Sequence, residues 1–242
     1  MLLLKPTAVV LDPATTAWVG AVVASGGTVS GARQTLVNTL IVGLKADGIW
    51  TKLDRLWIFA AENSFSAVID LVALAEALAS GVTFTPNRGY AGNGSSSFVR
   101  SFFRPATDGV AWTLNSAHIA VWDNTDRAEA DTVATGVYDS TLGPSGTYSD
   151  LTPFYVIGMR SRINGTTATI LDNSTSQGFF IGQRNDGSTI EYFYSGVSIG
   201  TAVSAATGVV DLPMYICARD DDTSPAFFST DQISMKIGRA HV

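Results

Sequence analysis

The sequence predicts a mainly β protein, an antiparallel β-sandwich or barrel preceded by an N-terminal helical hairpin. From Gly81 onward, short apolar runs alternate with turns rich in Gly, Asn and Asp at a spacing of roughly 8–12 residues, which is typical of such folds. Residues 1–48 instead carry apolar side chains at helical spacing. No motif repeats at a longer fixed period, which argues against a solenoid or a propeller.

The clearest single element is the stretch Gly178–Gly196, in which two aromatic-rich runs flank Asn185-Asp186-Gly187. These three residue types tolerate the positive φ angles of a tight hairpin, so we expect the flanking runs to pair antiparallel. Alternation along the second run places Glu191 and Phe193 on one face of the sheet.

The first 48 residues predict two helices joined by a short glycine loop. Asp12 is the expected N-cap of the first helix, with Pro13 at its first position, where the missing N–H costs nothing. Ser30 caps the second helix, and Asp47-Gly48 ends it. Isolated helices of this length are marginal, so the pair must dock on another part of the protein.

Residues 49–80 connect the two patterns. We expect a helical turn at Ile49–Leu53, a first strand at Leu56–Phe59, and mostly helix over Ser66–Ala79, where Val68, Leu71, Val72, Ala75 and Leu78 have helical spacing.

The sandwich itself is expected over residues 81–236, and Asn164-Gly165 predicts a second tight hairpin turn. The expected strands of this region are Val82–Thr85, Ser97–Phe103, Ala117–Trp122, Val133–Tyr138, Phe154–Ile163, Thr167–Asp172, Gly178–Arg184, Thr189–Tyr194, Val197–Val203, Met214–Arg219 and Gln232–Lys236.

The last six residues, 237–242, are the translation in one frame of a common sequencing-library adapter. We therefore expect this segment to be a non-native tail, with the natural gene continuing past Lys236. His118 would then be the one natural histidine, because His241 belongs to the tail.

Composition excludes several classes of function. The net charge is −6 with four lysines and no basic run, which argues against a nucleic-acid surface. No apolar run approaches the roughly 18–20 residues of a membrane span, and Lys5-Pro6 interrupts the first leucines too early for a signal peptide. Cys217, the single cysteine, lies in an apolar run and is expected to pack in the core.

The common hydrolytic sites are not visible either. A retaining glycosidase needs two carboxylates about 5 Å apart, yet none of the four glutamates has an acidic partner two residues along a strand. A serine or cysteine hydrolase needs a histidine base, and His118 has no G-x-S-x-G motif to serve. His118 is expected to share a strand face with Ala120 and Trp122.

Two loops are candidate binding sites. Arg88, Tyr90 and Asn93 belong to a glycine-rich loop whose side chains could stack on or hydrogen-bond a sugar, or which could be a structural turn. Asp220, Asp221 and Asp222 form the strongest charge cluster, expected on a rim loop. Such an oxygen-rich loop, like the weaker Asp123–Asp126, could hold calcium or remain a solvated acidic turn.

The chain resembles the concanavalin A-like, laminin-G-type jelly rolls of bacteriophage tail and other virion-associated proteins. The stretches that carry the resemblance are Leu44–Phe59, Phe84–Val99 (FTPNRGYAGNGSSSFV), Asn115–Asp123 (NSAHIAVWD), Met214–Arg219 (MYICAR) and Phe228–Ser234 (FSTDQIS). The resemblance implies a jelly-roll sandwich, displayed on a virion and often multimeric, that binds or builds without catalysing a reaction.

We therefore expect a non-enzymatic, lectin-like virion protein that binds a cell-surface glycan or other virion proteins, as a homo-oligomer. It would need no cofactor, with calcium at the acidic loop left open as an alternative, and it would contact neither nucleic acid nor membrane. Two alternatives remain: a purely structural oligomerisation module, and a polysaccharide-degrading enzyme with an atypical site. The expected ligand-binding residues are Arg88, Tyr90, Asn93, Asp220, Asp221 and Asp222.

Overall fold

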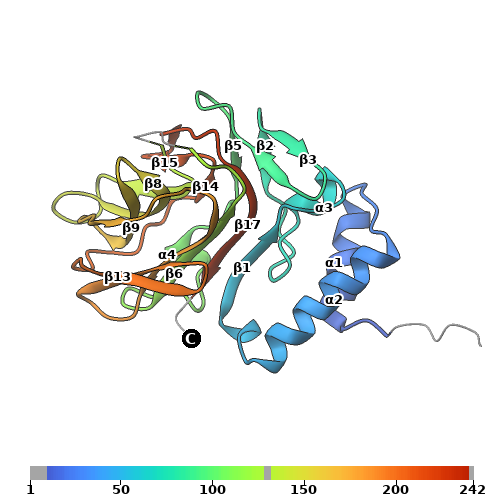
Figure 1. The fold of residues 1–242 in the computed structure, drawn as a ribbon. Coiled ribbons are helices and arrows are strands. Elements are labelled where there is room, and N and C mark those ends of the chain that lie inside the picture. Colours follow the sequence, from blue (N-terminus) through green and yellow to red (C-terminus); the bar gives the residue numbers. More distant parts are fainter. Residues whose placement is uncertain (1–9, 128–131, 240–242) are drawn as a thin grey trace, which may run out of the picture.

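A computed structural model describes residues 10–127 and 132–239, and it confirms the predicted fold class. Two mostly antiparallel sheets pack face to face as a sandwich, and a pair of N-terminal helices lies on one side of it (Figure 1). We call the sheet nearer these helices the helix-side sheet and the other the distal sheet.

The helix-side sheet runs in the order β13-β12-β11-β6-β17-β4-β3, with β1 also paired to β17. Its strands are β1 (Leu53–Ile58), β3 (Thr83–Thr85), β4 (Gly89–Ala91), β6 (Ala117–Asp123), β11 (Gly178–Arg184), β12 (Thr189–Tyr194), β13 (Val197–Val203) and β17 (Gln232–Arg239).

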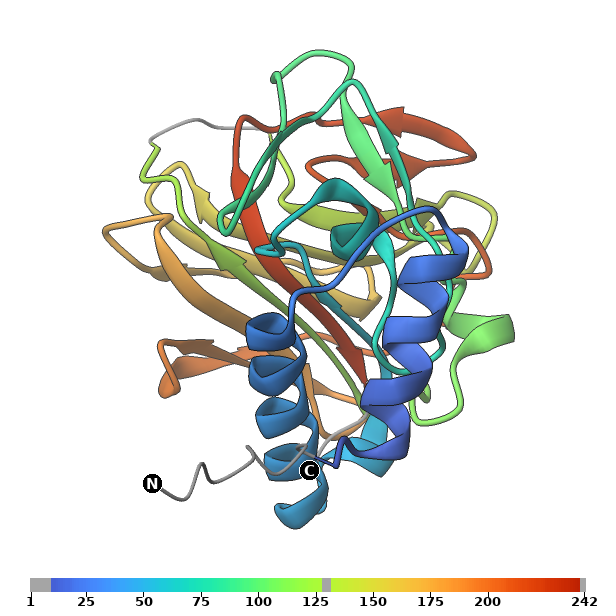
Figure 2. The same cartoon turned by 90° about the vertical axis from the view of Figure 1, so that its right-hand side faces the viewer.

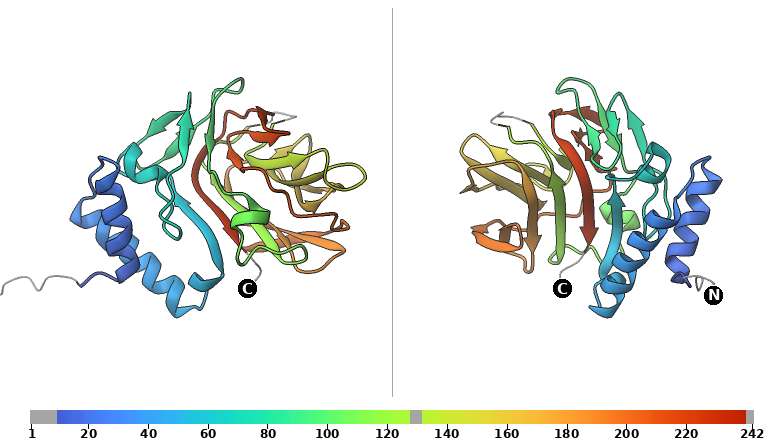
Figure 3. Two further views of the ribbon diagram at one scale, coloured as in Figure 1. Left: turned by 180° about the vertical axis from the view of Figure 1, so that it is seen from behind. Right: turned by 45° about the vertical axis from the view of Figure 1, so that its right-hand side comes forward.

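The distal sheet runs in the order β10-β9-β8-β7-β14-β5-β2, with β15 and β16 off this path. Its strands are β2 (Leu78–Ser80), β5 (Phe98–Arg100), β7 (Thr135–Asp139), β8 (Thr147–Tyr155), β9 (Gly158–Gly165), β10 (Ile170–Asp172), β14 (Tyr215–Ile216), β15 (Arg219–Asp221) and β16 (Ser224–Ala226). Figure 3 shows this sheet on the side of the sandwich away from the helices.

The helical hairpin consists of α1 (Pro13–Ala24) and α2 (Gly31–Ala46) and is capped as predicted. The side chain of Asp12 accepts a hydrogen bond from the backbone N–H of Ala14, and that of Ser30 accepts one from Arg33. The buried Trp18 indole donates to the carbonyl of Ile69 at 3.2 Å, which ties α1 to the segment after β1. Figure 2 shows both helices on the side of the sandwich where β1 and β17 lie.

The predicted helix over Ser66–Ala79 is wrong. The helix α3 (Ser64–Val68) ends early, and the chain turns before β2. The carboxylate of Asp70 accepts from the backbone N–H of Leu56 at 3.0 Å and of Val72 at 2.8 Å. A side chain that accepts a hydrogen bond from the N–H two residues ahead competes with the helical hydrogen bond. The spacing of apolar residues carries no information on this competition, so it predicted a longer helix. The two remaining short helices are η1 (Trp50–Lys52), as predicted, and α4 (Pro105–Asp108).

The hairpin at Asn185-Asp186-Gly187 is confirmed, although its turn works differently from the prediction. Strands β11 and β12 pair antiparallel with Gln183 opposite Glu191. None of the three turn residues has a positive φ. Instead, the Asp186 carboxylate accepts from the backbone N–H of Ser188 and of Thr189, both at 2.7 Å, and these hydrogen bonds lower its pKa to about 2.

The second predicted hairpin, at Asn164-Gly165, is confirmed in its pairing, since β9 and β10 are antiparallel with Ile170 opposite Arg160, and Asn164 has a positive φ of 55°. The two-residue turn is not confirmed, because β9 continues through Gly165. The run Phe154–Ile163 is divided between β8 and β9 by a turn that includes Val156, which has a φ of 60°. Asn164 lies at the end of β9, where its buried amide donates to the carbonyls of Thr113 and Leu114 at 2.9 and 3.0 Å. Its sequence favours a turn, and the fold uses its polarity to hold a distant loop.

The predicted strand Met214–Arg219 is likewise two strands. Cys217 has a φ of 60° and separates β14, which is antiparallel to β7, from β15, which is parallel to it. The Cys217 side chain is fully buried, as predicted. Burial raises the pKa of its thiol well above the ordinary value, so the thiol is unreactive.

Strand β17 extends past Lys236 through Arg239, and it lies between β6 and β1. Residues 237–239 therefore complete a central strand, and residues 240–242 lie outside the described part of the chain. The non-native origin of segment 237–242 stays a prediction.

Candidate functional site

The loop predicted around Arg88, Tyr90 and Asn93 does not form one exposed binding surface. Tyr90 lies on β4, is 3% exposed, and packs against Phe59 and Phe84 at ring-centroid distances of 5.9 and 5.1 Å. A ring held in the core cannot stack on a sugar, so this role of Tyr90 is corrected. Replacing it would also disturb folding, and binding could not be measured separately.

The other two side chains of this loop have local structural contacts. Arg88 is exposed and donates to the Gln232 side chain at 2.8 Å. Asn93 accepts from the backbone N–H groups of Ser95, Ser96 and Ser97, a turn that orders its own segment.

The three aspartates 220–222 lie on a β-hairpin between β15 and β16 rather than on a rim loop. Asp220 is fully buried, and this burial raises its pKa to about 6. Asp221 accepts from Arg219 at 2.7 Å, and Asp222 accepts from the backbone N–H of Ser140 at 2.6 Å. Their partners differ, so the three carboxylates are not arranged as one ligand set.

Within residues 10–127 and 132–239, no three carboxylate, histidine or cysteine side chains are grouped so as to hold a metal ion. The structure therefore adds no support for calcium at Asp220–Asp222 or at Asp123–Asp126.

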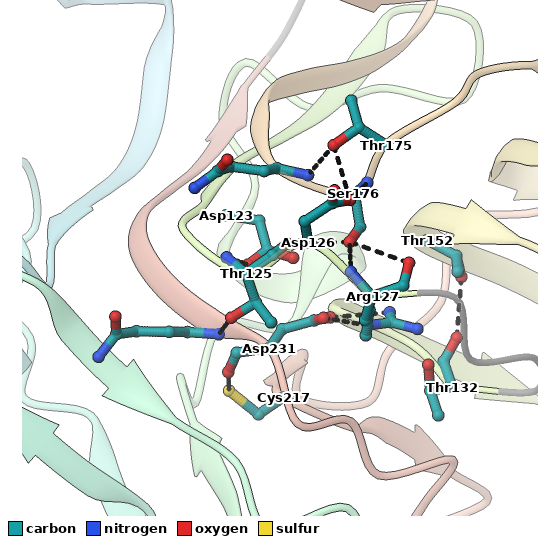
Figure 4. A network of polar contacts seen from close by, with 12 residues as sticks. Asp123, Thr125, Asp126, Arg127, Thr132, Thr152, Thr175, Ser176, Cys217 and Asp231 are labelled. Atoms are coloured by element: carbon teal, nitrogen blue, oxygen red, sulfur yellow. Dashed lines mark hydrogen bonds and ion pairs between the residues drawn. The ribbon is translucent and has the colours of Figure 1, made fainter.

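The segment Asp123–Asp126 belongs to a buried ion-pair network (Figure 4). The Arg127 guanidinium donates to both carboxylate oxygens of Asp231, which is fully buried. Burial and the neighbouring Asp231 charge raise the pKa of Asp123 to about 10, so Asp123 is neutral at pH 7. The positive charge in this cluster is the Arg127 guanidinium. Its ion pair with Asp231 links the chain after β6 to the chain before β17.

His118 is buried on β6 and faces α2, on the same side of the sheet as Ala120. Both line an apolar cavity of about 290 Å³ between α2 and the helix-side sheet. The other lining residues are apolar: Leu40, Leu44, Ile49, Leu53, Leu56, Phe179, Ile181, Met235 and Ile237.

The glutamates keep the structural roles expected of isolated carboxylates. Glu62 accepts from the backbone N–H of Ser30 at 2.6 Å, and Glu191 accepts from the Ser198 hydroxyl at 2.6 Å. Glu129 lies outside the described residues.

The outer face of the distal sheet carries a concentration of polar and aromatic side chains. Register places Tyr138 on β7 opposite Tyr148 on β8, and Asp150 on β8 opposite Arg162 on β9. Because their neighbours Val137, Leu151 and Ile163 are buried in the core, alternation turns these side chains away from the sandwich interior. We define the arginine–tyrosine surface as Tyr138, Tyr148, Tyr155, Arg160, Arg162, Arg219 and Phe227.

Asp150 is the electrostatic centre of this surface. It is fully buried and forms ion pairs with Arg162 and, at 3.5 Å, with Arg219. Burial alone would raise the pKa of Asp150, but the charges of Arg162, Arg160 and Arg219 hold it below its usual value. The carboxylate is therefore ionised and fixes two guanidinium groups in place.

Aromatic rings order the arginines further. The Arg162 guanidinium lies 3.4 Å from the Tyr148 ring centroid, and Tyr148 stacks on Tyr138 at 4.1 Å. Arg219 lies 4.0 Å from the ring of Phe227 and 5.0 Å from that of Tyr148. Tyr138 and Tyr148 are half-buried and Phe227 is 39% exposed, so rings and hydroxyls remain open to a ligand.

A shallow groove of about 330 Å³ borders this surface and includes one of the predicted residues. Asp222 lines it with Asp139, Thr141 and Leu212. The backbone N–H of Asp222 donates to the Tyr138 carbonyl at 3.2 Å, which places the groove beside Tyr138.

Sequence reasoning missed most of the arginine–tyrosine surface, although a signal was present. Arg160 and Arg162 lie two residues apart in a run whose other members are apolar or small, and Tyr148 and Asp150 have the same spacing. Such spacing puts each pair on one strand face. Only the register of β8 and β9 shows that the two pairs share a face.

No helix in the described ranges is long and apolar enough to cross a membrane.

Comparison with known proteins identifies the fold. No protein-family model and no curated protein matches the chain. The fourth domain of an extracellular arabinanase from Geobacillus stearothermophilus, solved with arabinotriose, is 12% identical with a TM-score of 0.51, covering 79% of this chain and 94% of that domain. A Trypanosoma rangeli sialidase, solved with a difluorinated nononic acid, is 11% identical with a TM-score of 0.55, covering 86% of this chain and 37% of the sialidase.

A carbohydrate-binding module of a Ruminococcus gnavus sialidase, solved with α2,3-sialyllactose, is 14% identical with a TM-score of 0.41, covering 52% of this chain and 76% of that one. At these identities the likeness concerns the fold. The chain shares its sandwich fold with the arabinanase domain.

Proposed function

We propose that this protein is a non-enzymatic glycan-binding module whose ligand contacts the arginine–tyrosine surface. The observation that carries the proposal is a set of half-exposed aromatic rings on the outer face of the distal sheet, with the half-buried guanidinium of Arg160 beside the buried Arg162 and Arg219. Aromatic rings pack against sugar C–H faces and arginines donate to sugar oxygens, so this combination suits a saccharide.

The fold supports this proposal. The arabinanase domain of the same architecture was solved with a bound oligosaccharide, although the low identity transfers no individual residue. Of the residues predicted as ligand-binding, Asp221 and Asp222 border the proposed surface. Arg88 and Asn93 belong to other contacts, so they do not enter the proposal.

Phe227→Ala should weaken glycan binding about fivefold or more, because a partly exposed ring that contacts a ligand contributes on the order of 1 kcal/mol. Titration calorimetry against the best ligand from a glycan array would measure this loss. Trp122→Ala is the matched control, since Trp122 is 46% exposed on the helix-side sheet. Loss of binding in the control variant alone would move the site to the other sheet. Release of reducing sugar from the bound glycan would instead favour the enzymatic alternative.

We further propose that the module is a virion component that acts in host attachment, as the resemblance of its sequence to phage tail proteins implies. Mass spectrometry of purified particles that carry the gene would test this, and absence of the protein from the particles would contradict it.

A structural role in assembly is the second candidate, and the apolar groove beside α2 favours it. Leu36 is 62% exposed and Leu40, which lines the groove, is 37% exposed. If these side chains pack in an oligomer, Leu36→Glu should convert the oligomer to a folded monomer in light-scattering measurements. The same molar mass for both proteins would exclude this face from assembly.

A further inference from the structure

We propose that the ligand of the arginine–tyrosine surface is an acidic saccharide, and that Arg160 donates to its carboxylate. This inference rests on the proposed glycan-binding function and specifies the chemical class of the glycan. It follows from the ion pairs of the neighbouring arginines, from the contacts of Arg160, and from the position of Arg160 at the solvent boundary.

Two of the three arginines of the surface are already paired with carboxylates. Asp150 pairs with Arg162 and Arg219, and Arg219 also pairs with Asp221. These pairs account for two arginines and two aspartates. Arg160 is the third cation of the cluster, and it forms no ion pair with any residue of the described ranges. A guanidinium without a carboxylate partner favours an anionic ligand.

The contacts of Arg160 leave donor capacity for a ligand. One terminal nitrogen lies 3.4 Å from the Thr152 hydroxyl, a long contact, and the Nε atom has no hydrogen-bond partner in the described part of the chain. The hydroxyl of Thr132, whose carbonyl accepts from Thr152, is also buried without a partner there. A guanidinium presents a planar fork of donors that matches a carboxylate. Because Nε and the Thr132 hydroxyl are buried, the terminal nitrogens of Arg160 are the donors proposed to meet the ligand.

Arg160 is also held ready for such a contact. Its guanidinium lies 4.0 Å from the Tyr155 ring centroid, and the residue is half-buried. Burial lowers its pKa from the ordinary value of arginine, although Asp150 opposes this effect. A cation that has lost part of its hydration gains more from an anionic partner than an exposed one does.

The test compares acidic glycans with neutral counterparts of the same backbone. The probes are polygalacturonate with its carboxyl-reduced form, and sialyllactose with lactose. We expect the acidic member of at least one pair to bind at least tenfold more tightly, a difference of about 1.4 kcal/mol. This preference should shrink as the salt concentration rises.

Variants then assign the preference to Arg160. Arg160→Gln should bind the acidic and neutral probes with similar affinity, and Arg160→Lys should retain part of the preference, because lysine keeps the charge but loses the planar fork. Arg88→Gln is the matched control, since Arg88 is an exposed arginine of the helix-side region, and it should behave like the unchanged protein. Circular dichroism melts of each variant would establish that it is folded.

The outcomes separate the two proposals. Equal binding of acidic and neutral probes, lost in Phe227→Ala, would overturn the acidic ligand and leave the glycan-binding function standing. An acidic preference that survives Arg160→Gln in a folded variant would overturn the role of Arg160. Failure of the folded, unchanged protein to bind any glycan would overturn both proposals.

Discussion

Lys236→Met should raise the free energy of unfolding by about 3 kcal/mol at pH 7. Lys236 is fully buried, and the rings of Trp57 and Phe103 lie 5.2 and 5.3 Å from its ammonium group. Within the described residues, its ammonium group donates to the sulfur of Met214 at 3.7 Å. Burial lowers the pKa of Lys236 to about 7. Folding must therefore either release the proton that this lysine carries in the unfolded chain or bury its positive charge, and both cost free energy. Methionine fills a similar volume without that cost.

The pH dependence identifies the cause. Between pH 7 and 10.5 the unfolded chain binds more protons at this lysine than the folded protein does, so the lysine's penalty shrinks as the pH rises. Asp123 acts in the opposite direction, because its raised pKa removes stability as the pH rises toward 10. The informative quantity is therefore the difference between variant and unchanged protein in urea denaturation at pH 7 and pH 10. A stabilisation of equal size at both pH values would contradict this explanation.

Lys52→Met is the control. Lys52 lies in the partly exposed turn η1, where its charge stays hydrated, so removing that charge should not raise the free energy of unfolding. We expect a change within about 0.5 kcal/mol for this variant at both pH values.

Asp54→Ala should destabilise the protein by about 3 kcal/mol, since it would leave the buried N–H of Trp112 and two partly buried N–H groups without acceptors. The Asp54 carboxylate, 5% exposed on β1, accepts from the backbone N–H groups of Val110, Ala111 and Trp112 at 2.7, 2.8 and 2.8 Å. The carboxylate thus accepts the hydrogen bonds that backbone carbonyl groups accept in regular secondary structure. Chemical denaturation would measure the loss.

A graded series makes the Asp54 test specific. Asp54→Asn keeps one acceptor oxygen and should lose less stability than Asp54→Ala. Asp172→Ala, at an exposed carboxylate, should change stability by no more than about 0.5 kcal/mol. If Asp54→Ala unfolds at the same urea concentration as the unchanged protein, the turn does not depend on these hydrogen bonds.

The amino-acid sequence by itself determined the elements whose signals are local. The caps at Asp12 and Ser30 and the strands Gly178–Arg184 and Thr189–Tyr194 agree with prediction, because capping residues and strict alternation act over a few neighbouring positions. The class of fold followed from the spacing of such strands.

Tertiary structure alone decided the features that depend on distant partners. Asp70 ends the predicted helix with a hydrogen bond from Leu56, and the side chain of Asn164, at the end of β9, holds the distant Thr113 and Leu114. A side chain that bonds across the fold overrides the preference of its neighbours, and no sequence window contains both partners.

Contacts between distant residues also decided which candidate binding residues are exposed and which lie together. Alternation places Tyr90 on one face of its strand, but only the packing of Phe59 and Phe84 shows that this face is the core. Arg160 and Arg162 are separated from Arg219 by more than fifty residues, and sheet register with the β15–β16 hairpin gathers them around Asp150. The sequence determined which residues share one face of a strand, and the pairing of distant strands decided which of them share a surface.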